Sequence, residues 1–222
     1  MHMIDITFDF ETCALSPNAA VMSMAAVVWD RNGEDTPFYT DEDRLKYPTY
    51  SAHVDLRSMF IDGFDFDKRT SDWWASQSDE AKANVLAVDN YDEPCLPIKD
   101  VVENFFSWVS AVEKSMQSSD VNLWCQGSDF DIAILRNICN KYHIDLPIKH
   151  NHFRDHRTFY MEGAKTLCDI AGAEFDPARA YAMVDDYEGD GVKHDPTFDC
   201  QRSIASTWQM MKHLRSLKIE KE

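Results

Sequence analysis

Two carboxylates lie two residues apart near the start of the chain. Asp9 and Glu11 end the largely apolar segment 4–11, which has the character of a buried strand. Alternate side chains of an extended strand point to the same face, so both carboxylates would project together from its end. Neighbouring carboxylates repel each other unless a cation lies between them. The pair is therefore a candidate site for Mg²⁺ or Mn²⁺.

A third candidate carboxylate lies where a predicted strand meets a predicted helix. The segment 127–135 contains both Asp129 and Asp131. The Phe-Asp context favours Asp131 as the ligand, and Asp129 then suits a helix cap. A carboxylate at a helix start is more often a cap than a ligand, so this signal carries weight only together with the others.

A histidine and a fourth carboxylate lie near the end of the chain. His194 precedes Asp199 by five residues, and Asp195 and Pro196 between them suit the cap and the first turn of a helix. Asp199 would then lie on the first turn, with His194 on the preceding loop. A mobile loop would let His194 approach a metal site when substrate is present.

The elements that must position these residues follow from apolar periodicity and turn signals. Asn32-Gly33 favours a hairpin turn, and the segment 176–192 has the character of an acidic loop. Strands are predicted at 3–10, 21–29, 37–40 and 121–125, and helices at 97–116, 129–142, 157–171 and 196–216, with further helix starts at Ser71 and Ser78. An antiparallel meander followed by helices and a later strand indicates an α/β fold with a mixed sheet flanked by helices.

The composition limits the class of protein. The chain of 222 residues is expected to form a single domain over residues 1–222. It has no apolar run long enough to span a membrane and no signal peptide, so we expect a cytoplasmic protein. Its six cysteines form no C-x-x-C pair, and we expect them to be reduced thiols. The net charge of -17 favours solubility and argues against broad capture of a duplex. The alternative explanation of this charge is that the chain is an acidic binding protein that mimics DNA and has no catalytic activity.

In their order and context, these motifs resemble the DEDD superfamily of 3′–5′ exonucleases in its histidine-bearing DEDDh branch. The motifs that support this resemblance are Asp-Phe-Glu-Thr at 9–12, Phe-Asp-x-x-x-Leu at 130–135 and His-x-x-x-x-Asp at 194–199. The chain is also similar from end to end to the exodeoxyribonuclease A group of T-even bacteriophages, which would place it in a host cytoplasm. That similarity includes the Ser-Asp-Trp-Trp segment 71–74. One departure is Thr12-Cys13-Ala14, where the family usually has Thr-x-Gly.

The resemblance implies an RNase H-like fold and a two-metal mechanism with Mg²⁺ or Mn²⁺. Asp9 would bridge both cations, Glu11 and Asp199 would complete one site, and Asp131 would hold the second. His194 would be the general base that accepts a proton from the attacking water. The substrate would be the 3′ end of single-stranded nucleic acid. DNA is favoured by the phage resemblance, and RNA is the nearest alternative because related bacterial proteins include exoribonucleases.

Several residues have a weaker case for substrate binding. Neighbouring positions on a helix point in different directions, so Trp73 and Trp74 cannot have the same role. Trp73 is expected in the core, and for Trp74 a place in the core and stacking on a base are both open. By resemblance, Thr12 would contact the terminal nucleotide through its backbone. The run 149–157 is the most basic of the chain, and its histidines fit no recognised zinc pattern. We expect a solvated loop there, with phosphate contact by Arg157 as the functional alternative.

Overall fold

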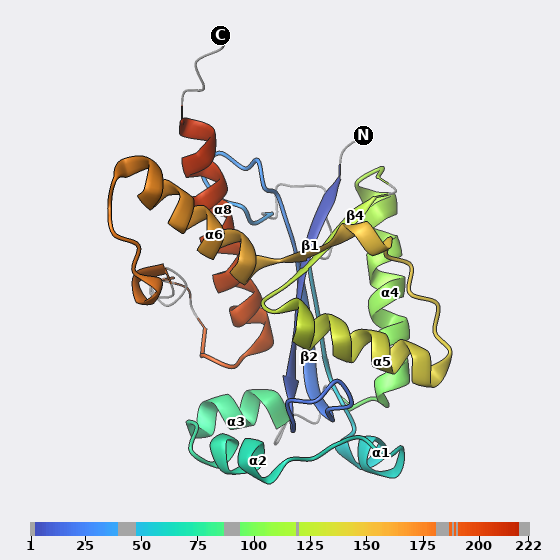
Figure 1. Ribbon diagram of the computed structural model, residues 1–222. Helices are drawn as coiled ribbons and strands as arrows, with labels where there is room; N and C mark the ends of the chain where they lie inside the picture. Colours follow the sequence, from blue (N-terminus) through green and yellow to red (C-terminus); the bar gives the residue numbers. More distant parts are fainter. Residues whose placement is uncertain are drawn as a thin grey trace.

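A five-stranded mixed sheet forms the centre of the molecule (Figure 1). The computed structural model describes residues 3–39, 48–86, 94–118, 120–180, 187, 189 and 191–217. The strand order is β3-β2-β1-β4-β5; β1, β2 and β3 are antiparallel neighbours, and β4 and β5 join β1 in parallel. The strands are β1 (Ile4–Thr12), β2 (Val21–Trp29), β3 (Thr49–His53), β4 (Val121–Cys125) and β5 (Phe153–Asp155). The predicted α/β class with a mixed sheet is confirmed.

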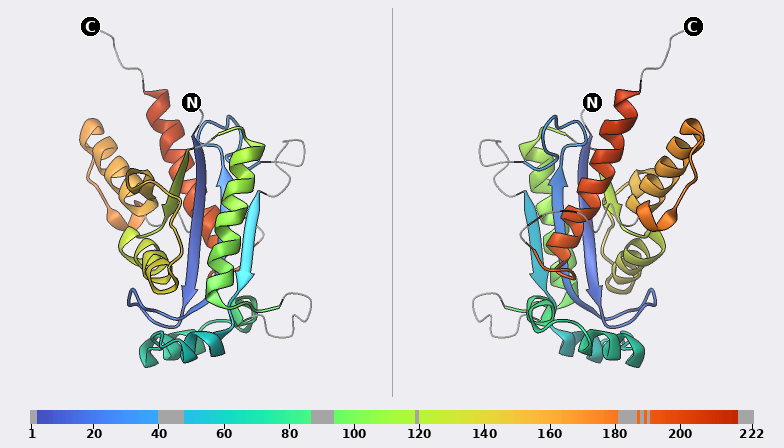
Figure 2. Two further views of the ribbon diagram at one scale, coloured as in Figure 1. Left: turned by 90° about the vertical axis from the view of Figure 1, so that its right-hand side faces the viewer. Right: turned by 90° about the vertical axis from the view of Figure 1, so that its left-hand side faces the viewer.

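Helices cover both faces of this sheet and one of its ends. Helix α4 lies across one face and α8 across the other, as the two views of Figure 2 show. Helices α1, α2 and α3 lie at the end of the sheet where β1 terminates (Figure 1). The helices are α1 (Leu56–Ile61), α2 (Lys68–Ala75), α3 (Asp79–Leu86), α4 (Ile98–Ser115), α5 (Ala133–Tyr142), α6 (His156–Ala171) and α8 (Pro196–Ser216), with the short turns η1 (Ser128–Ile132) and η2 (His150–His152).

Strand β1 presents a different chemistry to each face of the sheet. Its even-numbered residues from Ile4 to Phe10 are buried in the core that α4 and α5 cover. Its odd-numbered residues are polar and point the other way, where Thr7 meets α8: its carbonyl accepts a hydrogen bond from the Cys200 thiol. Because side chains alternate along a strand, this register places Asp9 and Glu11 on the α8 side.

The local signals in the sequence fix most element boundaries, with two corrections. The hairpin turn at 30–37 is present, but its return segment makes only one isolated bridge, between Phe38 and Trp29, and the third strand is instead β3. Helix α2 begins at Lys68 rather than near Ser71, because Asp67 accepts hydrogen bonds from the amides of residues 69 and 70 and so caps the helix earlier. Residue 40, at the end of the expected strand, lies outside the described residues.

The expected acidic loop at 176–192 is partly helical, since residues 177–180 form helix. Its residues 181–186, 188 and 190 lie outside the described part of the chain. All six cysteines are free thiols, as the sequence predicted. Among the helices that the structure describes, none combines the length and apolar character needed to cross a membrane.

Candidate active site

Asp9 and Glu11 lie at the end of β1, on the face that α8 covers. The ladder between β1 and β2 is regular as far as Glu11 and shifts its register between Glu11 and Thr12. Beyond this irregularity the Thr12 hydroxyl donates to the Ala14 carbonyl at 2.7 Å and turns the chain away from the sheet. The two carboxylates are therefore held on regular strand geometry, and the unusual Thr12-Cys13-Ala14 segment begins where that geometry ends.

Asp131 is brought to β1 by a turn of π-helix between β4 and α5. Gly127 has φ +125°, a conformation that favours glycine, and the wide turn η1 follows it. Asp131 is buried, and its Oδ1 accepts a hydrogen bond of 3.3 Å from the backbone amide of Phe10, the residue between the two β1 carboxylates. Asp129 is exposed within the same turn and makes no cap. The structure therefore places Asp131, and not Asp129, beside β1, and the expected cap at Asp129 is wrong.

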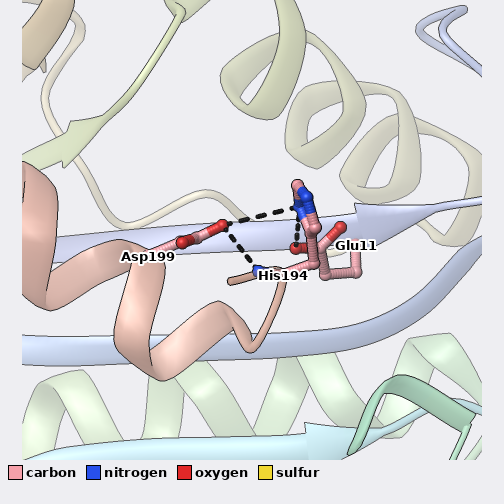
Figure 3. A group of neighbouring side chains, drawn as sticks. All are labelled: Glu11, His194 and Asp199. Atoms are coloured by element: carbon pink, nitrogen blue, oxygen red, sulfur yellow. Dashed lines mark hydrogen bonds and ion pairs between the residues drawn. The ribbon is translucent and has the colours of Figure 1, made fainter. Parts of the chain in front are cut away.

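His194 and Asp199 reach the site from the start of α8. The side chain of Asp195 accepts from the amides of Thr197 and Phe198, which confirms it as the cap of this helix. His194 precedes the cap in a left-handed conformation, with φ +70°, and its amide donates to Asp199 Oδ2 at 3.3 Å. Figure 3 shows the His194 ring between Glu11 and Asp199, with Nδ1 3.9 Å from Glu11 Oε1 and 3.9 Å from Asp199 Oδ2.

The electrostatics of this group are those of crowded, poorly hydrated carboxylates. Burial, reinforced by the charges of Asp199 and Asp131, raises the pKa of Glu11 to about 9. Burial and the same neighbours also raise the pKa of Asp9 well above its ordinary value. Burial raises the pKa of Asp131 to about 7, against the lowering effects of the Phe10 amide and Arg157. The charge of a divalent cation would offset the repulsion between these buried carboxylates. Because all the donors are oxygens, the group suits Mg²⁺ or Mn²⁺.

Two cavities with different linings meet at this point. An acidic cavity of about 210 Å³ is lined by the four carboxylates, His194 and two arginines. A mainly apolar cavity of about 470 Å³ is lined by Thr12, Leu15, Trp73 and Trp74, among others. Phe10, Glu11 and Phe130 line both cavities, so the two are adjacent. A charged group in one could thus be covalently joined to a flat apolar group in the other.

Of the two tryptophans, Trp73 has the opposite exposure to the one expected, and Trp74 agrees with the core alternative. Trp73 is 43% exposed, so its predicted place in the core is wrong, whereas Trp74 is 9% exposed. The Trp74 indole N–H donates to the Thr12 carbonyl at 2.9 Å, which ties α2 to the end of β1. Both rings pack edge-on against the imidazole of His194, with centroids 4.8 Å away for Trp73 and 5.8 Å for Trp74.

Two arginines line the acidic cavity. Arg157, expected as a phosphate contact, lies on the first turn of α6, and its guanidinium donates to the Gln126 carbonyl at 3.3 Å. Arg202 was not singled out in the sequence, and it forms an ion pair of 2.8 Å with Asp199. Its spacing of three residues from Asp199 on a helix was the available signal, because such residues are neighbours on a helix surface.

Known proteins with similar sequence and fold include several nucleases. The exodeoxyribonuclease of Enterobacteria phage T4 is 32% identical over 133 residues, which span 60% of this chain and 54% of that protein. The fold is similar to cell-death related nuclease 4 (TM-score 0.60, 15% identity, 95% of this chain and 64% of that one). It is also similar to the nuclease domain of 3′hExo, a DEDDh family member bound to rAMP (TM-score 0.57, 13% identity, 99% and 96%).

These similarities confirm the RNase H-like exonuclease fold and the resemblance to the DEDDh superfamily. The phage protein is longer than the matched region, which spans about half of its length. The sequence profile of one family matches residues 4–208 and so includes all five candidate site residues. The chain belongs to this family, the 3′-5′ exoribonuclease Rv2179c-like domains.

Proposed function

We propose that this chain is a metal-dependent 3′–5′ exonuclease that hydrolyses phosphodiester bonds at the 3′ end of single-stranded DNA. The observation that carries the proposal is the convergence of four carboxylates and one histidine in a single cavity. They come from β1, the η1 turn and the start of α8, which lie far apart in the sequence. We further propose that residues 1–222 form one exonuclease domain, since the η1 turn and α8, which carry the other site residues, both contact β1 of the single sheet.

The carboxylates are the proposed ligands of two divalent cations, Mg²⁺ or Mn²⁺. Asp9 would be shared between both cations, Glu11 and Asp199 would complete one site, and Asp131 would complete the other. This division is supported by the positions of Glu11 and Asp199 beside His194, whereas Asp131 bonds to the Phe10 amide. Bound cations would supply positive charge for the phosphate and for the leaving 3′ oxygen.

His194 is the proposed general base. Its Nδ1 faces the cavity between two carboxylates, and burial lowers the pKa of its imidazole. A lowered pKa keeps the ring neutral at physiological pH, and a neutral ring can accept a proton from a water that attacks phosphorus. The left-handed backbone at His194 and the two indole edges limit the positions that this ring can take.

The paired cavities suit a terminal nucleotide. The scissile phosphate would occupy the acidic cavity, with Arg157 at its edge, and the terminal nucleoside would occupy the apolar one. Thr12 and Trp74 line the apolar cavity, but the Thr12 carbonyl and the Trp74 indole N–H already bond to each other. We therefore propose that they shape this cavity through packing. Trp73 has the more exposed ring for a base to contact.

An exoribonuclease on the same scaffold is the second candidate. The description of the matching family favours it, whereas the phage relative is an exodeoxyribonuclease. A distant third candidate, an acidic protein that mimics DNA, predicts carboxylates spread over exposed faces. The concentration of four carboxylates in one cavity counts against that candidate.

One assay tests the proposal. DNA and RNA oligonucleotides of equal sequence, labelled at the 5′ end, are incubated with the protein in Mg²⁺, Mn²⁺ or a chelator, and Asp9→Asn serves as the control protein. We expect a ladder of 3′-shortened products that needs the metal and Asp9, with DNA degraded faster than RNA. Faster degradation of RNA would select the exoribonuclease. Shortening that persists in chelator, or none on either substrate, would refute the metal-dependent exonuclease.

A further inference from the structure

We propose that Glu11, His194 and Asp199 form a second type of metal site, which binds Zn²⁺ through the imidazole as well as through the two carboxylates. Within the part of the chain that the structure describes, this is the one group of histidine, cysteine or carboxylate side chains whose ligand atoms lie this close. The site shares Glu11 and Asp199 with the proposed Mg²⁺ or Mn²⁺ site and differs from it by recruiting His194.

The distances suit a tetrahedral ion. The three ligand atoms lie within 4.8 Å of one another, and Nδ1 is 3.9 Å from each of the two carboxylate oxygens (Figure 3). Zinc bonds of about 2.0–2.2 Å place neighbouring tetrahedral ligands about 3.3–3.6 Å apart. The two distances from Nδ1 therefore need to close by only about half an ångström. The distance between the two carboxylate oxygens, which is at most 4.8 Å, needs to close by no more than about 1.5 Å. Three protein ligands leave the fourth position open to water or phosphate.

The surroundings hold the imidazole in this orientation. Trp73 and Trp74 pack edge-on against the ring, and the His194 backbone amide is bonded to Asp199. Nδ1 of the same ring lies 3.9 Å from an oxygen of each of the two carboxylates (Figure 3). A ligand that is already oriented loses little conformational freedom on binding a metal.

The imidazole nitrogen should make this group of ligands selective for zinc over the metals of the proposed reaction. Mg²⁺ and Mn²⁺ are best served by carboxylates and water, whereas imidazole is a good ligand for Zn²⁺. Zn²⁺ also follows Mn²⁺ in the order of affinities for a given set of ligands. Removing the imidazole should therefore weaken Zn²⁺ binding strongly and leave Mn²⁺ binding largely intact.

Zinc bound in this way inhibits the reaction, a consequence that rests on the proposed function. The Nδ1 lone pair that ligates zinc cannot also accept a proton from water. Zinc occupancy also removes Glu11 and Asp199 from the other metal. Micromolar zinc would then suppress turnover even when Mg²⁺ or Mn²⁺ is plentiful, and a zinc-selective chelator would restore it.

Calorimetric titration of the metal-stripped chain with Zn²⁺ and with Mn²⁺ tests the site. The proteins compared are the wild type, His194→Asn and His150→Asn, the last of which removes an exposed histidine from the basic run of the chain. We expect His194→Asn to weaken Zn²⁺ binding by about tenfold or more, because the loss even of a residue that only orients a metal ligand reduces metal affinity by about that factor. Mn²⁺ affinity should change by less than about threefold, and His150→Asn should match the wild type.

A second measurement follows zinc binding in the wild-type protein itself. In the wild-type protein, the imidazole nitrogen resonances are followed by NMR during Zn²⁺ titration, with the His194 signals identified by their loss in His194→Gln. A shift confined to His194 supports the site. Unchanged zinc affinity in His194→Asn, or zinc shifts confined to His150 and His152, would overturn it. Absence of nuclease activity in Mg²⁺ and Mn²⁺ would refute the proposed function while leaving this test unaffected.

Discussion

The site residues store unfavourable electrostatic free energy in the metal-free protein. Asp9 and Glu11 share one face of β1, and Asp131 is fixed beside them by the Phe10 amide. Burial raises the pKa of all three, and repulsion from neighbouring carboxylates raises the pKa of Asp9 and Glu11 further. A fold built only for stability would avoid this arrangement, and stabilising substitutions at such sites commonly reduce function.

Asp9→Asn therefore separates stability from activity. A neutral amide avoids the free energy spent on burying this carboxyl, whose pKa is raised well above its ordinary value. The free energy of unfolding of the metal-free protein should therefore rise by about 1 kcal/mol, the equivalent of roughly one pKa unit. Nuclease activity should fall by about 10³-fold or more, because the transition state loses preorganised charge stabilisation. Chemical denaturation in chelator and a turnover assay in Mg²⁺ measure the two effects. More than a tenth of wild-type activity in the variant would contradict the role given to Asp9.

Sequence alone could select the candidate ligands, because residue types and their order along the chain can be compared without knowledge of the fold. It could not rank Asp129 against Asp131 on physical grounds, since the π-helical turn that buries one and exposes the other depends on tertiary contacts. The exposure of Trp73 was missed for a similar reason. It depends on how α2 packs at the end of β1, where the Trp74 indole N–H donates to the Thr12 carbonyl.

At the scale of elements, the first turn of α8 is the part that the site depends on most. This turn carries Asp199, and His194 immediately precedes its cap at Asp195. The cap signal in the sequence was strong enough to give the helix its correct start. The third strand could not be predicted in the same way, because pairing of β3 with β2 is a long-range contact across residues 30–48. Local alternation at 37–40 was not a sufficient guide to it.

Asp195→Ala should therefore affect stability and turnover together. The cap accepts two backbone hydrogen bonds, and its loss should cost about 1 kcal/mol of unfolding free energy. Displacement of His194 and Asp199 should lower turnover by about tenfold or more, since catalysis is sensitive to small misplacements. Asp55→Ala is the matched control, because Asp55 caps α1 away from the cavity. Equal loss of activity in both variants would mean that global instability, not local positioning, is responsible.

At the scale of the whole molecule, the proposed function requires a chain of net charge -17 to bind a polyanion. Bound cations and a few placed arginines can achieve this locally while most of the surface repels nucleic acid. Arg157 lines the acidic cavity from the start of α6. Lys114 lies near the end of α4, at the opposite end of the sheet from the cavity (Figure 1).

Arg157→Gln should reduce the salt dependence of binding to a single-stranded oligonucleotide. If Arg157 contacts one phosphate, the slope of log affinity against log salt should become shallower by about 0.7. Binding is measured in an Asp9→Asn background, which prevents cleavage during the titration. Lys114→Gln in the same background should retain the parent slope. An unchanged slope for Arg157→Gln would assign Arg157 a purely structural role.

The acid sensitivity of the fold has its own source on the α8 side of the sheet. His156 is fully buried, and its two ring nitrogens lie 2.8 Å from the Thr7 hydroxyl and 2.6 Å from the Thr207 hydroxyl. Burial lowers the pKa of His156 from 6.5 to about 3, with Asp155 acting weakly in the opposite direction. The unfolded chain therefore binds a proton below about pH 6.5 that the folded chain does not accept, and stability falls as the pH decreases through this window.

His156→Gln keeps a neutral group between the two hydroxyls and removes the imidazole that binds this proton in the unfolded chain. Between about pH 7 and pH 5, the wild type should lose about 2 kcal/mol more unfolding free energy than the variant, since each pKa unit corresponds to about 1.4 kcal/mol. Both proteins are unfolded by urea in chelator at each pH. The carboxyl groups of Asp9 and Glu11 have raised pKa values and oppose this trend, but they are common to both proteins and cancel in the difference. Parallel stability curves would show that His156 is protonated in the folded state, or that the buried layer between β1 and α8 relaxes to admit its charge.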